Sequence, residues 1–221
     1  MLRKLVLLAA LVVYASTGSS PAQIFSVNAV GYINVSVKPG FNLIANQLIA
    51  QDNSIGSLFK NFNGGVVPGT TIYKLVDGKF LTATWDDLDN QYIPESTAAE
   101  LTLPGDGVFV YLPGFQEKVL TFVGELLQGD VCTQIPSGYS IKSSPIPQTL
   151  DFNALNFPGS AGDKVFRFNP RTGGFQMYQF DEVENRWPDF MPGIPVGEAV
   201  MALRQGPAID WCRTFFVNNP G

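Results

Sequence analysis

The sequence predicts an all-β protein made of two related modules in tandem, each an antiparallel sandwich or barrel-like sheet with one short helix. Short runs of strand-forming residues alternate with turn residues. The chain has 22 glycines, 16 prolines and 17 phenylalanines but only 15% charged residues. Two stretches also share one pattern of aromatic, acidic and asparagine residues, WDDLDNQY at 85–92 and FDEVENRW at 180–187. The segments around them recur in the same order, which indicates a tandem duplication.

In the first module, residues 23–126, a strand ends at the turn signal Pro39-Gly40 and a second strand follows at 41–49. A short amphipathic helix comes next, because apolar residues recur at helical spacing after a capping residue at Asn53 or Ser54. These apolar residues are Ile55, Leu58, Phe59 and Phe62. Asp77-Gly78 predicts a tight hairpin, and the acidic stretch leads to a third strand. Apolar strands are then expected at 108–112 and 117–126.

The second module, residues 127–221, repeats this order. Gly138-Tyr139 aligns with Gly40-Phe41, and Gly174-Phe175 aligns with Lys79-Phe80. The segment 151–157 takes the place of the helix, and the last strand, 212–217, is aligned with 118–123. No Pro- or Ser-rich spacer lies near 126–129, so we expect the modules to pack together. The alternative is a single pseudo-twofold barrel built from both halves.

Residues 1–22 read as a secretory signal peptide. Arg3 and Lys4 precede an apolar run from Leu5 to Ala15, and small residues lead to an expected cleavage site after Ala22. The run is about half of the roughly 20 residues needed to span a bilayer, which disfavours a membrane anchor. We therefore expect a protein that is secreted, periplasmic or at the cell surface, with no membrane span in the mature chain.

Charge and cysteine content limit the partners and the compartment. The chain has 14 basic and 19 acidic residues, and removal of the signal peptide with its two basic residues lowers the net charge from −5 to −7. We expect no nucleic-acid partner, because phosphate binding needs clustered Lys or Arg. Cys132 and Cys212 are an even pair in an exported chain, so we expect a disulfide within the second module. Two separate buried thiols are the alternative.

Two motifs of the first module, GFNLIANQL at 40–48 and LPGDGVFVYL at 103–112, carry a resemblance. With the short helix and the aromatic hairpin between them, they are similar to a module repeated in exported, mostly uncharacterised proteins of environmental bacteria. The second half departs from the pattern at GYSIKSSPI and IPVGEAVMAL. The resemblance implies a bacterial exported protein and no particular activity.

The acidic stretch is a candidate calcium site, because oxygen-rich loops bind calcium. Its acids are Asp86, Asp87 and Asp89, which recur as Asp181, Glu182 and Glu184. The spacing does not fit an EF-hand, since Tyr92 stands where the sharp-turn glycine should be. The alternative is a solvated hairpin turn in which Asn90 and Asn185 take the left-handed backbone conformation. We expect no cofactor other than a possible calcium ion.

The flanking aromatic residues Trp85, Tyr92 and Trp187 suggest a second binding hypothesis. Exposed rings could stack on the apolar faces of sugars. The favoured alternative is that cross-strand aromatic pairs stabilise the hairpin and cover the core, because Phe180 and Trp187 repeat the pair in the second half.

The chain has no histidine, which excludes Ser-His-Asp and Cys-His nucleophiles and imidazole metal sites. We expect a non-enzymatic protein of structure, adhesion or assembly whose partner is itself, an extracellular glycan or another protein. A carbohydrate-binding module that uses the hairpin aromatics is the first alternative. A hydrolase that depends on carboxylates is the second.

Overall fold

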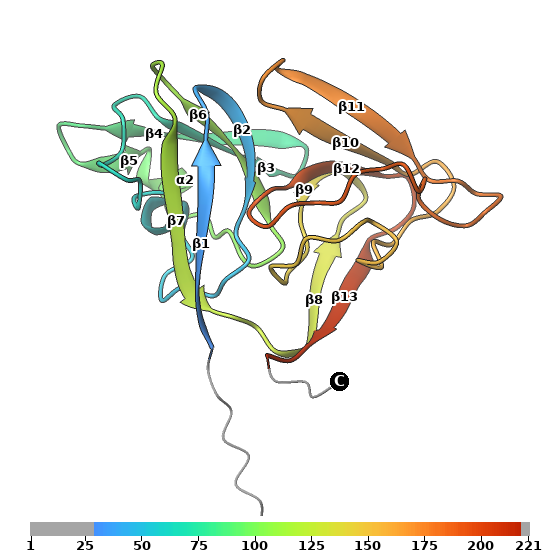
Figure 1. Ribbon diagram of the computed structural model, residues 1–221. Helices are drawn as coiled ribbons and strands as arrows, with labels where there is room; N and C mark the ends of the chain where they lie inside the picture. Colours follow the sequence, from blue (N-terminus) through green and yellow to red (C-terminus); the bar gives the residue numbers. More distant parts are fainter. Residues whose placement is uncertain (1–28, 218–221) are drawn as a thin grey trace, which may run out of the picture.

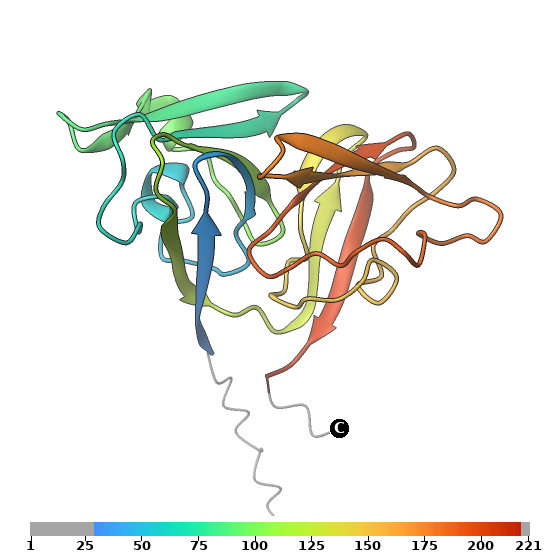
Figure 2. The same ribbon diagram turned by 45° about the horizontal axis from the view of Figure 1, so that its top comes forward.

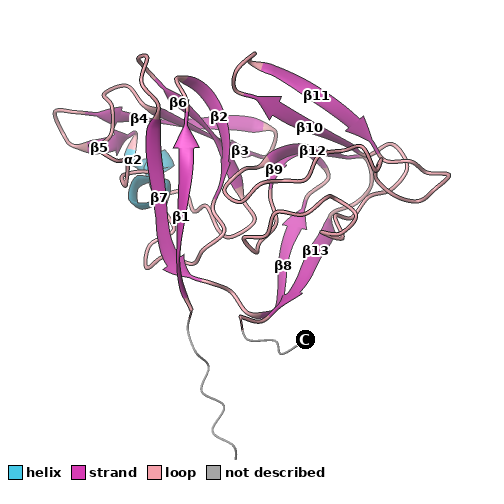
Figure 3. Ribbon diagram, viewed as in Figure 1, coloured by secondary structure: helices cyan, strands magenta, loops and turns pink. Residues whose placement is uncertain are grey.

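The computed structural model describes residues 29–217, which form two β-rich halves lying side by side (Figure 1). The predicted signal peptide, residues 1–22, lies outside this range. Strands dominate, and two short helices both belong to the first half (Figure 3). The predicted all-β class is confirmed.

The first half contains one two-stranded sheet and one five-stranded sheet. Its elements are β1 (Val30–Val37), β2 (Gly40–Ala45), α1 (Ile55–Leu58), β3 (Thr71–Val76), β4 (Lys79–Asp86), β5 (Gln91–Ile93), α2 (Glu95–Ala98), β6 (Gly107–Leu112) and β7 (Lys118–Glu125). The first strand, β1, pairs with the last, β7, and the others follow the order β2-β6-β3-β4-β5. Every pair is antiparallel.

The second half repeats this pairing scheme. Its elements are β8 (Gly129–Ile135), β9 (Gly138–Lys142), β10 (Lys164–Asn169), β11 (Gly174–Gln179), β12 (Val200–Arg204) and β13 (Ile209–Phe215). Here β8 pairs with β13, and the larger sheet has the order β9-β12-β10-β11. Between residues 29 and 217 no sheet closes into a barrel, so the barrel alternatives are wrong.

Turn chemistry places the hairpins where the sequence predicts them. Asp77 and Gly78 both have a positive φ (49° and 75°), and they join β3 to β4 as a tight hairpin. Asn90 and Asn185 each have a φ of 52°, which confirms the left-handed conformation expected at the ends of the two acidic turns. Asparagine tolerates this conformation better than other non-glycine residues do.

The helices differ from the prediction of one per module. Helix α1 forms as expected, and the Ser54 hydroxyl caps it by accepting from the Ser57 N–H (3.3 Å). A further helix, α2, follows β5, in a segment for which no helix was predicted. The segment 151–157 forms turns instead of a helix. Its chain begins a helical turn at Asp151, but Asn156 has a φ of 50°, and this left-handed residue ends the turn.

Each half has its own hydrophobic core between its two sheets. In the first half, β1 and β7 contribute Val37, Leu120 and Phe122, which pack against Ile72 and Val110 of the larger sheet. In the second half, the largest fully buried side chains are Trp187, Trp211 and Phe152. The arrangement is a small sandwich in each half.

A third core joins the halves, through contacts that are reciprocal. The Ala45 N–H of the first half donates to the Gly197 carbonyl of the second (2.9 Å), and the Ser143 N–H of the second half donates to the Gly105 carbonyl of the first (2.9 Å). The side chains at this junction come from both larger sheets and from the residue before β12: Leu43, Ala45, Phe109, Ile141 and Ala199. The halves therefore pack against each other, as expected from the lack of a spacer.

Candidate functional site

In each acidic turn, the side chain of the first aspartate accepts hydrogen bonds from the backbone of the same turn. The Asp86 carboxylate accepts from the N–H groups of Leu88 (2.8 Å) and Asp89 (3.4 Å). Asp181 does the same for Val183 (2.9 Å) and Glu184 (3.0 Å). Aspartate commonly closes turns in this way. The first carboxylate of each predicted calcium motif therefore has a structural role.

The remaining acids of these turns point to solvent. Asp87 and Asp89 are exposed, and no group of three or more His, Cys, Asp or Glu residues placed to hold a metal occurs in residues 29–217. In the second turn Glu184 is paired with Arg186 (2.7 Å). This hydrogen bond, with the nearby charge of Asp189, raises the pKa of Arg186. Calcium binding by either turn remains a hypothesis that rests on the sequence alone.

The aromatic rings beside the acidic turns are buried, so the sugar-stacking prediction for them is wrong. Trp85 and Tyr92 pack edge to face with centroids 5.2 Å apart, and Trp85 is only 7% exposed. The Tyr92 hydroxyl donates to the Phe59 carbonyl (2.9 Å), and burial raises the pKa of Tyr92. Trp187 is likewise buried, and its indole N–H donates to the Phe157 carbonyl (2.9 Å). These rings present no open face to a ligand, and they fill the cores as the alternative interpretation expected.

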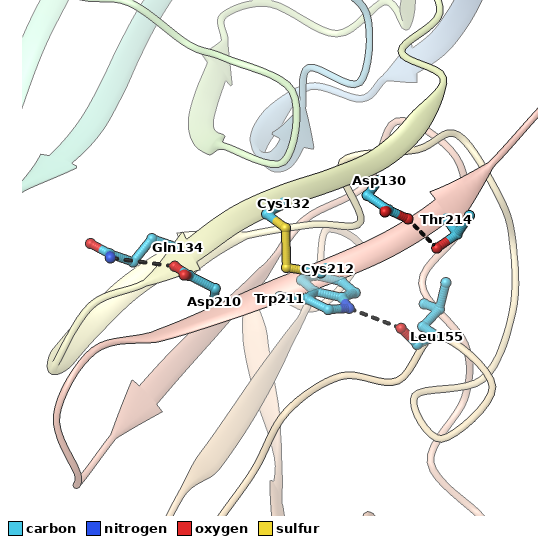
Figure 4. Close-up of a disulfide and its surroundings, with 8 residues drawn as sticks. All are labelled: Asp130, Cys132, Gln134, Leu155, Asp210, Trp211, Cys212 and Thr214. Atoms are coloured by element: carbon cyan, nitrogen blue, oxygen red, sulfur yellow. Dashed lines mark hydrogen bonds between the residues drawn. A yellow bond between two sulfur atoms is a disulfide. The ribbon is translucent and has the colours of Figure 1, made fainter.

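The predicted disulfide is confirmed. Cys132 and Cys212 lie directly opposite each other on β8 and β13, with Cα atoms 4.0 Å apart (Figure 4). The bond lies on the exposed side of the strand pair, whereas the neighbouring Trp211 points inward and donates to the Leu155 carbonyl (2.8 Å). The cysteines thus join the first and last strands of the second half.

The strand registers also correct the sequence alignment of the last strands. Cys132 corresponds to Asn34 and Cys212 to Thr121, not to Lys118 as the predicted alignment had it. Asn34 and Thr121 are themselves opposite each other, and the Thr121 hydroxyl donates to the Asn34 side chain (2.8 Å). A hydrogen bond in the first half therefore takes the place that the disulfide has in the second.

A group of nine aromatic side chains, several of them partly exposed, gathers where the halves meet. We call this group the aromatic face. Neighbouring rings within it have centroids 5.1–6.5 Å apart. Its members are Phe41, Tyr73, Phe80, Phe109 and Tyr111 of the first half and Tyr139, Phe166, Phe168 and Phe175 of the second.

Phe109 stands at the centre of the aromatic face and joins its two sides. Its ring is 5.4 Å from Phe168 and 6.2 Å from Phe175, both of the second half, and 6.1 Å from Phe80 of its own half. Phe109 is only 9% exposed, whereas Phe41, Phe80, Tyr139 and Phe175 at the margin are 44–49% exposed. The hairpins β3–β4 and β10–β11, which carry Phe80 and Phe175, lie on one side of the molecule (Figure 2).

A cleft of about 390 Å³ borders the aromatic face. The β3–β4 turn with Asp77 forms one wall, and β9 with Tyr139 forms the other. Inside it, Lys142 of the second half forms an ion pair with Asp106 of the first (2.7 Å), and both side chains are largely buried. A smaller cleft of about 150 Å³ between Ile44 and Phe168 occupies the corresponding place of the other half.

Sequence reasoning missed the aromatic face. The signal that could have found it is the presence of apolar residues on both sides of several strands, as in the run 108–112. In β6, Val108 and Val110 point into the core of the first half, so Phe109 and Tyr111 must point the other way. A strand that is apolar on both sides needs a second partner surface.

No protein-family model matches the chain, and neither a curated protein sequence nor a solved structure matches it. Among residues 29–217, no helix has the length and apolar character to cross a bilayer. The fold and the aromatic face therefore carry the functional argument.

Proposed function

We propose that the chain is an exported, non-enzymatic protein that acts in assembly or adhesion, and that it binds other protein surfaces through its aromatic face. One observation carries the proposal: a continuous group of rings spans both halves and leaves four of them, Phe41, Phe80, Tyr139 and Phe175, close to half exposed. Contiguous apolar patches on soluble proteins mark interaction sites, and aromatic residues are enriched at such interfaces.

The arrangement of the aromatic face favours a protein partner over a sugar. Three of the four marginal rings are phenylalanines, which lack a polar group to orient a sugar hydroxyl. The central ring, Phe109, is held by its neighbours on both sides, so the surface is preformed. A rigid aromatic surface loses little conformational entropy on binding.

Export is part of the proposal. It rests on the predicted signal peptide at residues 1–22 and on the disulfide between Cys132 and Cys212. Disulfides persist in oxidising compartments and are rare in the cytosol.

The test compares the purified protein with the double variant Phe41→Ser/Phe80→Ser. Negative-stain microscopy and light scattering would follow assemblies larger than a dimer, and a glycan array would test the carbohydrate alternative. We expect the double variant to weaken assembly at least about tenfold, because the loss of two aromatic side chains that a partner buries costs about 1 kcal/mol or more each.

The variant Phe115→Ser is the matched control. Phe115 is fully exposed in the turn before β7 and is not one of the rings of the aromatic face, so its replacement should leave assembly unchanged. Assembly that is equally strong in the double variant would contradict the proposal. So would a protein that stays free of larger assemblies while it binds glycans.

A further inference from the structure

Strand β11 is an open edge of the second larger sheet. It pairs with β10 on one side and, within residues 29–217, with no strand on the other. Figure 1 shows it as the outermost strand of its sheet. All of its residues except Tyr178 are exposed. An edge strand of this kind offers unpaired backbone groups to another chain.

The hydrogen-bond alternation shows which backbone groups are free to pair. The Phe180 N–H donates to the Asp163 carbonyl (3.0 Å), directly beyond the paired residues of β10 and β11. Hydrogen-bonded and non-hydrogen-bonded pairs alternate along an antiparallel ladder. The N–H and C=O groups of Phe175, Met177 and Gln179 therefore point away from β10.

The usual protection of edge strands is missing from β11. Its sequence, GFQMYQ, contains no charged residue and no proline, the two common devices that block edge pairing. In the first half, the corresponding strand β4 begins with Lys79, and β5 covers its other end at Thr84–Asp86. In the second half, as far as residue 217, only the single bridge between Asp181 and Arg186 stands in the place of β5.

We propose that β11 pairs with β11 of a second copy of this chain, antiparallel and about a twofold axis through Met177. The residues whose backbone N–H and C=O groups point away from β10 lie symmetrically about Met177. Phe175 of one copy therefore faces Gln179 of the other, and Met177 faces Met177. No like charges meet along the strand. A twofold contact of this type is closed and uses the same surface of both copies.

Charges at the two ends of β11 complement each other in this register. Arg171 lies six positions before Met177, and Glu182 and Glu184 flank the position six after it. Antiparallel pairing therefore brings the β10–β11 turn of one copy towards the acidic turn of the other. Opposite charges at the margin of an interface favour its register.

The pairing deepens the proposed assembly function, on which it rests, by naming a partner and a contact. Phe175 and Met177 lie on the same side of β11, the side of the aromatic face, because they are two residues apart. Joining two copies at β11 would therefore place their aromatic faces on one side of a continuous sheet.

Sedimentation velocity of Met177→Lys and Met177→Glu variants tests the proposal. The measurements use the Phe41→Ser/Phe80→Ser protein, in which larger assembly is weakened and a dimer can be seen alone. Each single charge should weaken dimerisation at least about tenfold, because like charges would meet at the axis. An equal mixture of the two variants should restore the dimer. Phe115→Lys is the control and should dimerise normally.

A covalent test is independent of affinity. Opposite Cα atoms in a hydrogen-bonded antiparallel pair are about 5.5 Å apart, a separation that a disulfide can bridge. A Met177→Cys variant should form a disulfide-linked dimer on mild oxidation, and Phe115→Cys should not. Circular dichroism confirms that each variant is folded.

The outcomes separate this inference from the proposed function. A monomer at all concentrations, or charge variants that dimerise like their parent, would overturn the pairing at β11 while leaving assembly through the aromatic face standing. A mixture that fails to restore the dimer would also overturn it. Dimers without larger assemblies would support β11 pairing and count against the proposed function.

Discussion

Replacing Gln47 by leucine would measure how strongly the two halves are joined. Gln47 belongs to the first half and is 1% exposed, and its side chain makes its hydrogen bonds to the second half, chiefly to backbone and also to the Ser143 hydroxyl (3.4 Å). Its side-chain oxygen accepts from the Gly197 N–H (2.8 Å), and its nitrogen donates to the carbonyls of Ser144 (3.0 Å) and Ile146 (3.3 Å).

The expected loss of stability follows from these contacts. Leucine has a similar size but no polar atom, so the Gly197 N–H and the Ser144 carbonyl would be buried without their partner. Each unsatisfied group costs about 1–3 kcal/mol, so the two groups give an expected loss of about 2–6 kcal/mol in the free energy of unfolding. With a urea slope of roughly 2 kcal/mol per molar, the midpoint should fall by about 1–3 M.

Urea unfolding followed by tryptophan fluorescence is the assay. Trp85 lies in the core of the first half, and Trp187 and Trp211 lie in that of the second, so the signal reports on both. Gln116→Leu, at an exposed turn position, is the control and should leave the midpoint unchanged. A shift for Gln47→Leu below about 0.3 M would show that these hydrogen bonds do not hold the halves together.

Three further changes test other parts of the fold. Replacing Cys132 and Cys212 by serine should lower the free energy of unfolding by up to ~4.5 kcal/mol, measured by urea unfolding, because an 80-residue loop loses its closure. Gly107→Ala should cost about 1–3 kcal/mol in the same assay, since its new Cβ would lie 2.5 Å from a side chain of the other half. Gly174→Ala, whose Cβ has room, should cost almost nothing. Burial raises the pKa of Tyr92, so its contribution to stability is fully present below its ordinary pKa of 10.0 and is lost as the pH rises above it. Tyr92→Phe should flatten this alkaline loss in melting curves.

Each of these expectations has an outcome that contradicts it. An unchanged mass of the protein on reduction would show that the cysteines are not joined in solution. Equal effects of Gly107→Ala and Gly174→Ala would mean that the junction has room for a methyl group. For Tyr92→Phe, a melting temperature that falls above pH 10 as steeply as that of the parent protein would exclude the buried phenol as the cause.

Local features of the fold could be predicted from the sequence because they depend on residues close together in the chain. Asp77-Gly78 specifies its hairpin through backbone preference alone, and Ser54 caps α1 through a contact three residues away. The prediction of a helix at 151–157 was wrong, and the reason is also local. The helix was expected there because the segment aligns with the helix of the first half, but Asn156 adopts the left-handed conformation that ends a helix.

The candidate site could not be predicted, because it depends on how the halves pack. Sequence alone identified Trp85, Tyr92 and Trp187 as aromatic and adjacent to acids, but not on which side of their strands they lie. Phe109 and Phe168 are far apart in the sequence, and only the junction brings their rings together. That both halves arose by duplication remains a prediction, supported by their common strand pairing.

The ends of the described chain lie on the side of the molecule opposite the β3–β4 and β10–β11 hairpins (Figures 1 and 2). The strand registers agree with this placement. Val30 in β1 faces Glu125 at the end of β7, and Phe215 in β13 faces Gly129 at the start of β8. Residues 126–128 link β7 to β8. A fluorophore, an affinity tag or a solid support attached at either end would therefore lie on the side of the molecule opposite the two hairpins. Immobilised protein should keep its binding surface accessible whichever end is used.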